Sequence, residues 1–252
     1  MISLVDLERI AARGWRGTSS GTLGDWLLRA GGGFTGRANS ALVLGTPGVE
    51  LAAAMERVEA FYADHDLPTM FQIPYAVDAP DDVPIRTSRL LQDAGWRPFN
   101  ETTVMVATVK AAGRTFPVSD VGVARHAATP SAEWLAGYRY RGAALPAAAP
   151  AVLVNAENPM FVSLHSDGEQ LGVARGVVVD GWLGVTAVTV AEAHRRRGVG
   201  TSLMGELVRR AAADGATHAY LQVDSANPAA LKMYGKGGFR EHHRYHYLTY
   251  AS

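Results

Sequence analysis

The segment 188–201 constrains the fold of this chain more than any other part of its sequence. It opens with a strand-like Val-Thr-Val run, passes through three consecutive arginines, and enters a long helical pattern beside two closely spaced glycines. The first turn of a helix offers unpaired backbone N–H groups and the positive end of the helix dipole, so it attracts anions. Glycine leaves room for a phosphate at those amides. We therefore expect a diphosphate-binding turn made of Arg195, Arg196, Arg197, Gly198, Val199, Gly200 and Thr201.

This turn differs from two common glycine-rich phosphate loops. The Walker loop requires a lysine directly after its second glycine, and the segment 188–201 contains no lysine. The dinucleotide-binding fingerprint requires a different spacing of its glycines. The turn therefore belongs to neither class.

The rest of the chain alternates between strand and helix patterns, which predicts an α/β fold with a mixed sheet covered by helices. Asp167-Gly168 is typical of a hairpin turn, and Gly215 is expected to end the long helix. In the second half we expect strands at 160–165, 170–179, 183–190, 218–224 and 239–250, and helices at 131–141, 198–213 and 228–236. In the first half we expect strands at 39–44, 69–73 and 102–108, and helices at 51–65 and 88–94.

A break in these patterns at residues 110–117, with the sequence KAAGRTFP, predicts a boundary between two domains, residues 1–114 and 115–252. The glycine-rich stretch 31–36 matches neither phosphate signature, so we interpret it as a plain turn.

Composition excludes several classes of function. Lys plus Arg (24) equals Asp plus Glu (24), so net charge gives no reason to expect a nucleic acid or a membrane surface as partner. The absence of cysteine excludes disulfides, a thiolate nucleophile and a cysteine-based zinc site. No stretch approaches the length of an apolar membrane span. We expect a cytoplasmic protein, and leave open whether it forms a homodimer.

The turn and the sequence after it resemble the GNAT N-acetyltransferase superfamily. The superfamily signature Gln/Arg-x-x-Gly-x-Gly/Ala is matched by Arg195, Gly198 and Gly200, and its later Asn, Tyr and Gly-Phe positions by Asn227, Tyr234 and Gly238-Phe239. The resemblance covers about residues 118–250 and implies a GNAT fold with acetyl-CoA as cosubstrate and an amine as acceptor. It also implies that the strand Val188, Thr189 and Val190 lines the cofactor, with backbone groups of Val188 and Val190 pairing with pantetheine.

By the same resemblance, Tyr234 is the expected catalytic acid, because a phenol with an ordinary pKa near 10 stays protonated at pH 7 and can donate to a leaving thiolate. Asn227 precedes Pro228, which predicts a helix cap. The resemblance implies that Asn227 also lies near the cofactor. The general base stays open among Asp224, His165 and Glu157. Deprotonating a lysine at pH 7 costs about 4.6 kcal/mol and an α-amine about 1.4 kcal/mol. A site without a clearly identified general base therefore favours an acceptor amine of low pKa.

The first half keeps the same order of elements but lacks the arginine-glycine turn. It resembles the degenerate half of a tandem GNAT protein of the actinobacterial type, which supports the second, active half.

A glycine, Gly237, replaces the leucine usual before Gly-Phe and should loosen the preceding helix. The histidines 242, 243 and 246 predict no metal site, since neighbouring positions on a strand face opposite ways. The alternative to an enzyme is a regulatory CoA-binding module without turnover.

Overall fold

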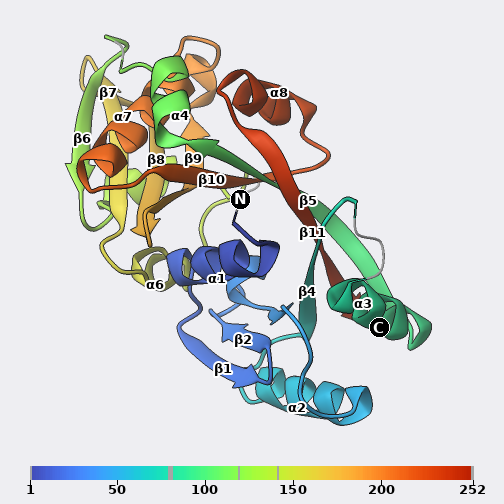
Figure 1. Cartoon of the computed structure of the whole chain (residues 1–252). Helices are drawn as coiled ribbons and strands as arrows, with labels where there is room; N and C mark the ends of the chain where they lie inside the picture. Colours follow the sequence, from blue (N-terminus) through green and yellow to red (C-terminus); the bar gives the residue numbers. More distant parts are fainter. Residues whose placement is uncertain (1, 79–81, 119, 141, 251–252) are drawn as a thin grey trace.

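Figure 1 shows a computed structural model of the chain, which describes residues 2–78, 82–118, 120–140 and 142–250. These residues form one eleven-stranded mixed sheet with the order β1-β2-β3-β4-β11-β5-β10-β9-β8-β7-β6. The strands are β1 (Ser19–Leu23), β2 (Trp26–Ala30), β3 (Ala41–Val43), β4 (Met70–Tyr75), β5 (Trp96–Thr108), β6 (Val123–Ala127), β7 (Met160–Ser166), β8 (Glu169–Val179), β9 (Trp182–Val190), β10 (His218–Asp224) and β11 (Arg240–Tyr250).

The helices are α1 (Leu4–Gly14), α2 (Leu51–Ala63), α3 (Val83–Asp93), α4 (Val109–Thr115), α5 (Ala132–Gly137), α6 (Ala149–Val154), α7 (Val199–Ala213) and α8 (Pro228–Lys236), with short 3₁₀ turns η1 (Gly36–Ala38) and η2 (Glu192–His194). Side chains cap several of these helices at their first turn. The backbone N–H of Asp6 donates to Ser3 Oγ at α1, and that of Ile85 donates to Asp82 Oδ1 at α3. No helix in the described ranges is long and apolar enough to span a lipid bilayer.

The two halves of the chain repeat one arrangement. In the first half, β3–α2–β4–α3–β5 begins with the parallel pair β3 and β4, and in the second half β9–α7–β10–α8–β11 begins with the parallel pair β9 and β10. The sheet thus contains two tandem units of the same topology, as the pattern of strands and helices predicted.

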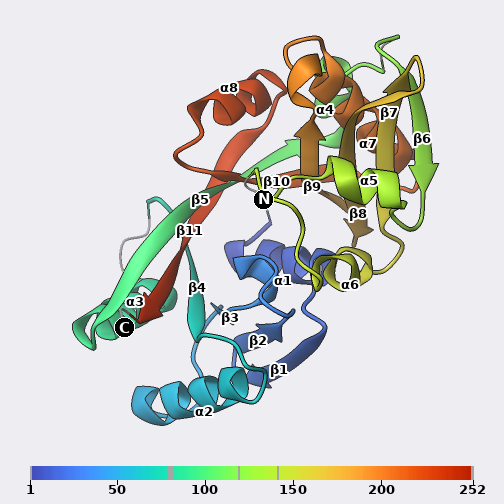
Figure 2. The same ribbon diagram turned by 180° about the vertical axis from the view of Figure 1, so that it is seen from behind.

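The halves exchange strands where they meet. Strand β11 of the second half lies between β4 and β5 and is antiparallel to both. Strand β5 of the first half lies in turn between β10 and β11. Figures 1 and 2 show β5 and β11 crossing the middle of the molecule side by side. Each half therefore completes the sheet of the other. The division into domains 1–114 and 115–252 stays a prediction.

Apolar side chains cover both faces of the second half of the sheet. On one face, Leu183 of β9 belongs to a core cluster with Leu203 and Leu207 of α7. On the other face, Val177 of β8 belongs to a cluster with Leu7 of α1. The alternation of apolar residues along the strands explains how one sheet supports helices on two sides.

Most of the expected elements are confirmed, but several bounds differ and some elements were not predicted. Residues 109–115, within the segment interpreted as a boundary, form α4, because Thr108 Oγ1 caps the helix by accepting from Ala111 N–H. Helix α1 was not predicted either, and strand β5 begins at Trp96, ahead of the expected residue 102. Helix α3 begins at Val83, ahead of the expected residue 88, because Asp82 caps it. Helix α5 ends at Gly137, short of the expected residue 141, which lies outside the described residues. The hairpin β1–β2 and strand β6 were not predicted.

Gly237 has a packing role that the sequence did not reveal. A Cβ at this position would lie 2.2 Å from Cζ of Phe116, whose ring is buried against the end of α8. The missing side chain therefore admits the Phe116 ring; the expectation that this glycine loosens the helix considered the backbone alone.

Candidate functional site

Strand β9 leaves β10 halfway along its length. The two strands pair in parallel from Trp182 to Val185, whereas β9 continues to pair with β8 on its other edge as far as Val190. A bulge interrupts the ladder with β8 between residues 186 and 189, and within it Ala187 has a φ of 55°. A bulge of this kind bends a strand. The result is a split between β9 and β10, with the backbone of residues 186–190 along one side.

The expected strand residues line this split. The side chains of Val188 and Val190 pack against the core cluster under α7, and Thr189 is half-buried. The side chains of both valines are half-buried against this core. The expected role of their backbone groups in binding a ligand stays a prediction.

The turn between β9 and α7 ends in a helix terminus without a side-chain cap. Gly198 is the N-cap residue, with a φ of 83°, and the first helical hydrogen bond runs from Ser202 N–H to Gly198 O. The amides of Val199, Gly200 and Thr201 precede that bond and have no acceptor within the helix. A Cβ at Gly200 would meet nothing closer than Val190 Cγ2 at 3.6 Å. Protein packing therefore leaves the space beside these amides open, which is the arrangement an anion requires.

The three arginines of the turn lie on the surface next to this terminus. Arg195, Arg196 and Arg197 are all exposed, and Arg196 has a φ of 62° that turns the chain toward α7. The neighbouring His194 has its Nε2 atom 3.2 Å from Oε1 of Glu169. The arginines thus provide the exposed positive charge of the turn, while His194 faces a carboxylate.

Tyr234 lies in α8, on the same face of the sheet as the start of α7. It is 8% exposed and belongs to the core cluster that includes Val199. Its ring contacts Phe239 edge to face, with 6.0 Å between ring centroids. Burial raises the pKa of the Tyr234 phenol to about 12. The phenol is therefore protonated throughout the neutral pH range.

Asn227 caps α8, as expected. Its Oδ1 atom accepts from Ala230 N–H at 3.0 Å, and Pro228 occupies the first position of the helix. Asn227 also lines a pocket, so it connects the helix cap to the candidate site.

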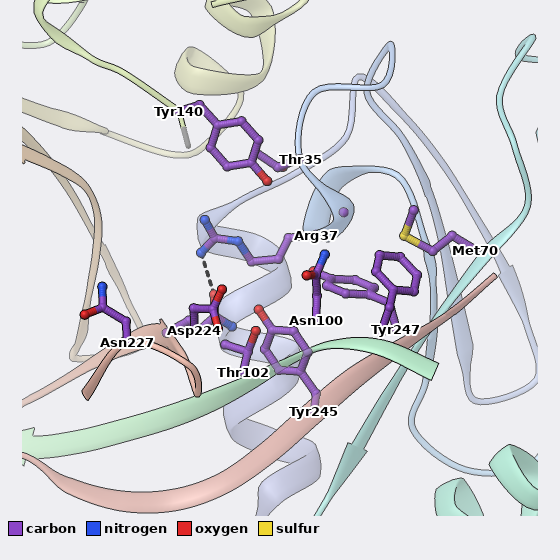
Figure 3. A pocket seen from close by; sticks show the side chains of 13 residues that line it. Thr35, Arg37, Met70, Asn100, Thr102, Tyr140, Asp224, Asn227, Tyr245 and Tyr247 are labelled. Atoms are coloured by element: carbon purple, nitrogen blue, oxygen red, sulfur yellow. Dashed lines mark hydrogen bonds between the residues drawn. The ribbon is translucent and has the colours of Figure 1, made fainter. Parts of the chain in front are cut away.

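This pocket has a volume of about 420 Å³ and lies where the two halves of the chain meet, as Figure 3 shows. Gln222 and Asp224 on its wall belong to the end of β10, beyond Leu221, the last residue of β10 that pairs with β9. The pocket therefore lies at the end of β10 where this strand no longer pairs with β9, and no described residue of β9 lines it. Its lining residues are Thr35, Gly36, Arg37, Met70, Phe99, Asn100 and Thr102 from the first half, and Tyr140, Gln222, Asp224, Asn227, Tyr245 and Tyr247 from the second.

Of the three candidate bases, Asp224 alone lies among the residues that line this pocket. Its Oδ1 atom accepts from Ala226 N–H at 2.9 Å, and the side chain is exposed. His165 is buried on β7 with its Nε2 atom 3.0 Å from Ser163 Oγ, and Glu157 lies in an exposed loop after α6. The geometry separates both from the split.

A residue with a left-handed backbone conformation projects into the same pocket. Asn100 has a φ of 50° where the register between β5 and β11 shifts. Asparagine adopts this conformation more readily than most other residues, because its short polar side chain can form local hydrogen bonds. Figure 3 shows the Asn100 side chain among the pocket residues, close to Tyr245 and Tyr247.

Sequence reasoning missed Arg37, Asn100 and the tyrosines of β11, because they come from distant segments. Arg37 donates to Oε1 of Gln222 although 185 residues separate them. The one local signal was the glycine-rich stretch 31–36. It was interpreted as a plain turn, and its residues Thr35 and Gly36 line the pocket.

The histidines near the C-terminus have structural partners. The Nε2 atom of His243 lies 2.8 Å from Oε1 of the buried Glu8, and that of His246 lies 3.0 Å from Oγ of Ser88. Within the part of the chain that the structure describes, no group of three or more His, Asp or Glu side chains is arranged to hold a metal ion.

Comparison with known proteins agrees with this fold. Residues 3–248 match the sequence family described as "Probable histone acetyltransferase Rv0428c C-terminal". The "Probable histone acetyltransferase Rv0428c" of Mycobacterium tuberculosis is 30% identical over 98% of this chain and 74% of its own length. The "Uncharacterized N-acetyltransferase YobR" of Bacillus subtilis is 27% identical over 96% of each chain.

Among solved structures, a GCN5-related N-acetyltransferase from Kribbella flavida has the same fold. Its TM-score is 0.70 at 18% identity, and the alignment covers 100% of this chain and 97% of that one. The family match extends over almost the whole chain and includes both halves of the sheet. The chain therefore belongs to this family, and it is an acetyltransferase of the GNAT superfamily.

Proposed function

We propose that this acetyltransferase uses acetyl-CoA and transfers the acetyl group directly to an amine, either of a small molecule or at a peptide N-terminus. The observation that carries the proposal is the uncapped N-terminus of α7 beside the split between β9 and β10. Both features leave backbone groups without partners, and they lie next to each other in the chain. When bound, acetyl-CoA would supply the reactive thioester.

The turn residues fit the diphosphate of the cofactor. The amides of Val199, Gly200 and Thr201 would receive its oxygens, with Gly198 providing the left-handed turn that aims them. Arg195, Arg196 and Arg197 would add charge-assisted hydrogen bonds. The backbone of Val188 and Val190 would pair with the pantetheine arm as an added strand does.

Tyr234 is the proposed general acid. Its hydroxyl is protonated at neutral pH, and burial among apolar residues strengthens a hydrogen bond from it to a thiolate that develops nearby. Since no cysteine is available to accept the acyl group, the two reactants must meet directly, and their positioning would supply much of the rate enhancement.

Asp224 is the proposed group that receives the acceptor amine. Its location supports this role, because Asp224 lines the pocket and lies on the part of β10 that no longer pairs with β9. A carboxylate at this point would hold the ammonium form and accept its proton, directly or through water, before attack.

The test of the cofactor site is calorimetry with CoA on the wild-type protein and on an Arg195→Glu, Arg197→Glu variant. Losing two charge-assisted hydrogen bonds and reversing both charges should weaken binding by at least about 100-fold. The matched control is Arg57→Glu, Arg97→Glu, which makes the same change in net charge at exposed residues of α2 and β5. Equal CoA affinity in the two double variants, or no affinity in the wild-type protein, would overturn the proposal.

A further inference from the structure

Arg37 brings a positive charge into the pocket without a carboxylate to balance it. Among the residues that the structure describes, no Asp or Glu oxygen lies within 4.0 Å of its guanidinium, whereas other arginines have such partners, for example Arg13 with Asp180 at 2.5 Å. Figure 3 shows the Arg37 side chain extending from the first half of the chain across the pocket.

Neutral groups hold this side chain in one position. Its guanidinium lies over the ring of Trp15, 4.6 Å from the centroid, and one of its nitrogens donates to Gln222 Oε1 at 2.5 Å. Trp15 is itself fixed by a hydrogen bond to Thr35 Oγ1. The backbone beneath Arg37 is tightly packed, since a Cβ on Gly36 would lie 2.7 Å from Cζ of Tyr247. Arg37 is therefore oriented in advance, but its charge is not neutralised.

Apart from one residue, the remaining wall of the pocket is uncharged. Burial raises the pKa of both Tyr245 and Tyr247, so their phenols are neutral at pH 7. Asn100 and Asn227 contribute amides. Asp224 is the one carboxylate among the described lining residues. The pocket thus presents one fixed cation from the first half and one anion from the second.

The Arg37 side chain is half-buried, and holding its charge partly away from solvent without a counter-charge is unfavourable, so the pocket gains from a ligand that supplies an anion. A ligand with an ammonium group for Asp224 and an anion for Arg37 satisfies both charges at once. Arginine binds a carboxylate through two parallel hydrogen bonds, which also fixes the orientation of the ligand. The pocket volume of about 420 Å³ is in the range of small-molecule sites.

We propose that the acceptor is a small amino carboxylate, such as an amino acid, whose carboxylate is bound by Arg37 while its amine faces Asp224. This inference rests on the proposed acetyl transfer to an amine. It gives the first half of the chain a direct part in choosing the acceptor.

The experiment compares matched amines in a thiol-release assay with acetyl-CoA. A set of amino acids is tested, each beside its primary amide and its decarboxylated amine, with the wild-type protein, Arg37→Gln and Arg37→Lys. We expect the wild-type protein to prefer the carboxylates by about 10- to 100-fold in kcat/KM, mainly through KM. Arg37→Gln should lose this preference, and Arg37→Lys should keep part of it.

Two control measurements distinguish a loss of acceptor preference from a folding defect. CoA affinity by calorimetry should be the same for both Arg37 variants as for the wild-type protein, since the diphosphate turn lies on α7. The control Arg57→Gln removes an exposed arginine of α2 and should leave the preference intact. Equal rates for carboxylates and neutral amines, or an equal loss for both classes in Arg37→Gln, would overturn the proposal.

Binding separates this inference from the proposed function. N-acetyl amino acids and the matching neutral N-acetyl amines are titrated into the CoA-bound protein by calorimetry. Binding of the carboxylates that disappears in Arg37→Gln would support the inference even if no amine releases thiol, in which case the transfer reaction would be refuted alone. Equal binding of the neutral compounds would refute the inference, whatever the outcome for acetyl transfer.

Discussion

Replacing Gly237 by alanine should destabilise the protein through a single clash. The added Cβ would lie 2.2 Å from Cζ and 2.3 Å from Cε2 of Phe116. Gly237 has a φ of −73° and a ψ of 6°, which alanine adopts without strain, so the backbone contributes nothing. The Phe116 ring is 4% exposed and contacts Phe239 at a centroid distance of 6.3 Å, so it has little room to move. Overpacking of this kind costs about 1–3 kcal/mol.

The matched control is Gly235→Ala in the same helix. A Cβ at Gly235 meets nothing within 4 Å, and alanine in a helix gains about 0.5–1 kcal/mol over glycine. Urea unfolding of both variants should therefore give midpoints on opposite sides of the wild-type value with similar m-values. In a Phe116→Leu background the cost at Gly237 should shrink. Equal stability of the Gly237→Ala and Gly235→Ala variants would refute the packing argument.

Three further predictions concern catalysis, pH and the contribution of the first half. Tyr234→Phe should lower kcat by about 10²–10⁴-fold with unchanged CoA affinity in calorimetry, and full turnover would contradict the acid role. Burial lowers the pKa of His242 and of His246 below the 6.5 of the unfolded chain. Just below pH 6.5 the unfolded state therefore binds more protons than the folded state, so the protein loses stability as the pH falls. The urea midpoint should be lower at pH 5.5 than at pH 7.5, and a constant or rising midpoint would contradict this. Deleting residues 1–114 removes β5 from between β10 and β11, so the fragment should not fold. A soluble, fully active fragment 115–252 would contradict that expectation.

Local sequence signals predicted the second half of the fold well, because each element carries its own start or stop. Asn227-Pro228 gave the beginning of α8, and Asp167-Gly168 gave the β7–β8 hairpin, where both residues have a positive φ. The hairpin β1–β2 was missed although Gly24-Asp25 is a hairpin dipeptide, because each of its strands has five residues and β1 contains few apolar ones.

The exchange of β5 and β11 could not be predicted from the pattern of residues. The apolar residues of each strand indicate which of its faces are buried, and that pattern is the same whichever neighbour the strand pairs with. Their order in the sheet depends on contacts between distant segments, such as Tyr245 with Thr102. Sequence periodicity describes the face of a strand and contains no information on its partner.

The candidate site divides in the same way. The diphosphate turn was predictable because strand, arginines, glycines and helix follow each other within one segment. The pocket was not, because Arg37 and Asp224 are brought together only when the two halves fold against each other. A lone arginine after a glycine-rich turn has no distinguishing feature until its neighbours in space are known to lack a carboxylate.

The lack of an arginine-glycine turn in the first half therefore does not make that half dispensable. It supplies β5 to the sheet of the second half and the cationic wall of the pocket, while the second half supplies the helix terminus and the split. If the cofactor is bound by one half and the acceptor is selected largely by the other, substitutions in the two halves should affect different properties of the enzyme. Changes at Arg195 and Arg197 should weaken CoA binding for every acceptor. Changes at Arg37 should alter the choice of acceptor and leave CoA binding unchanged.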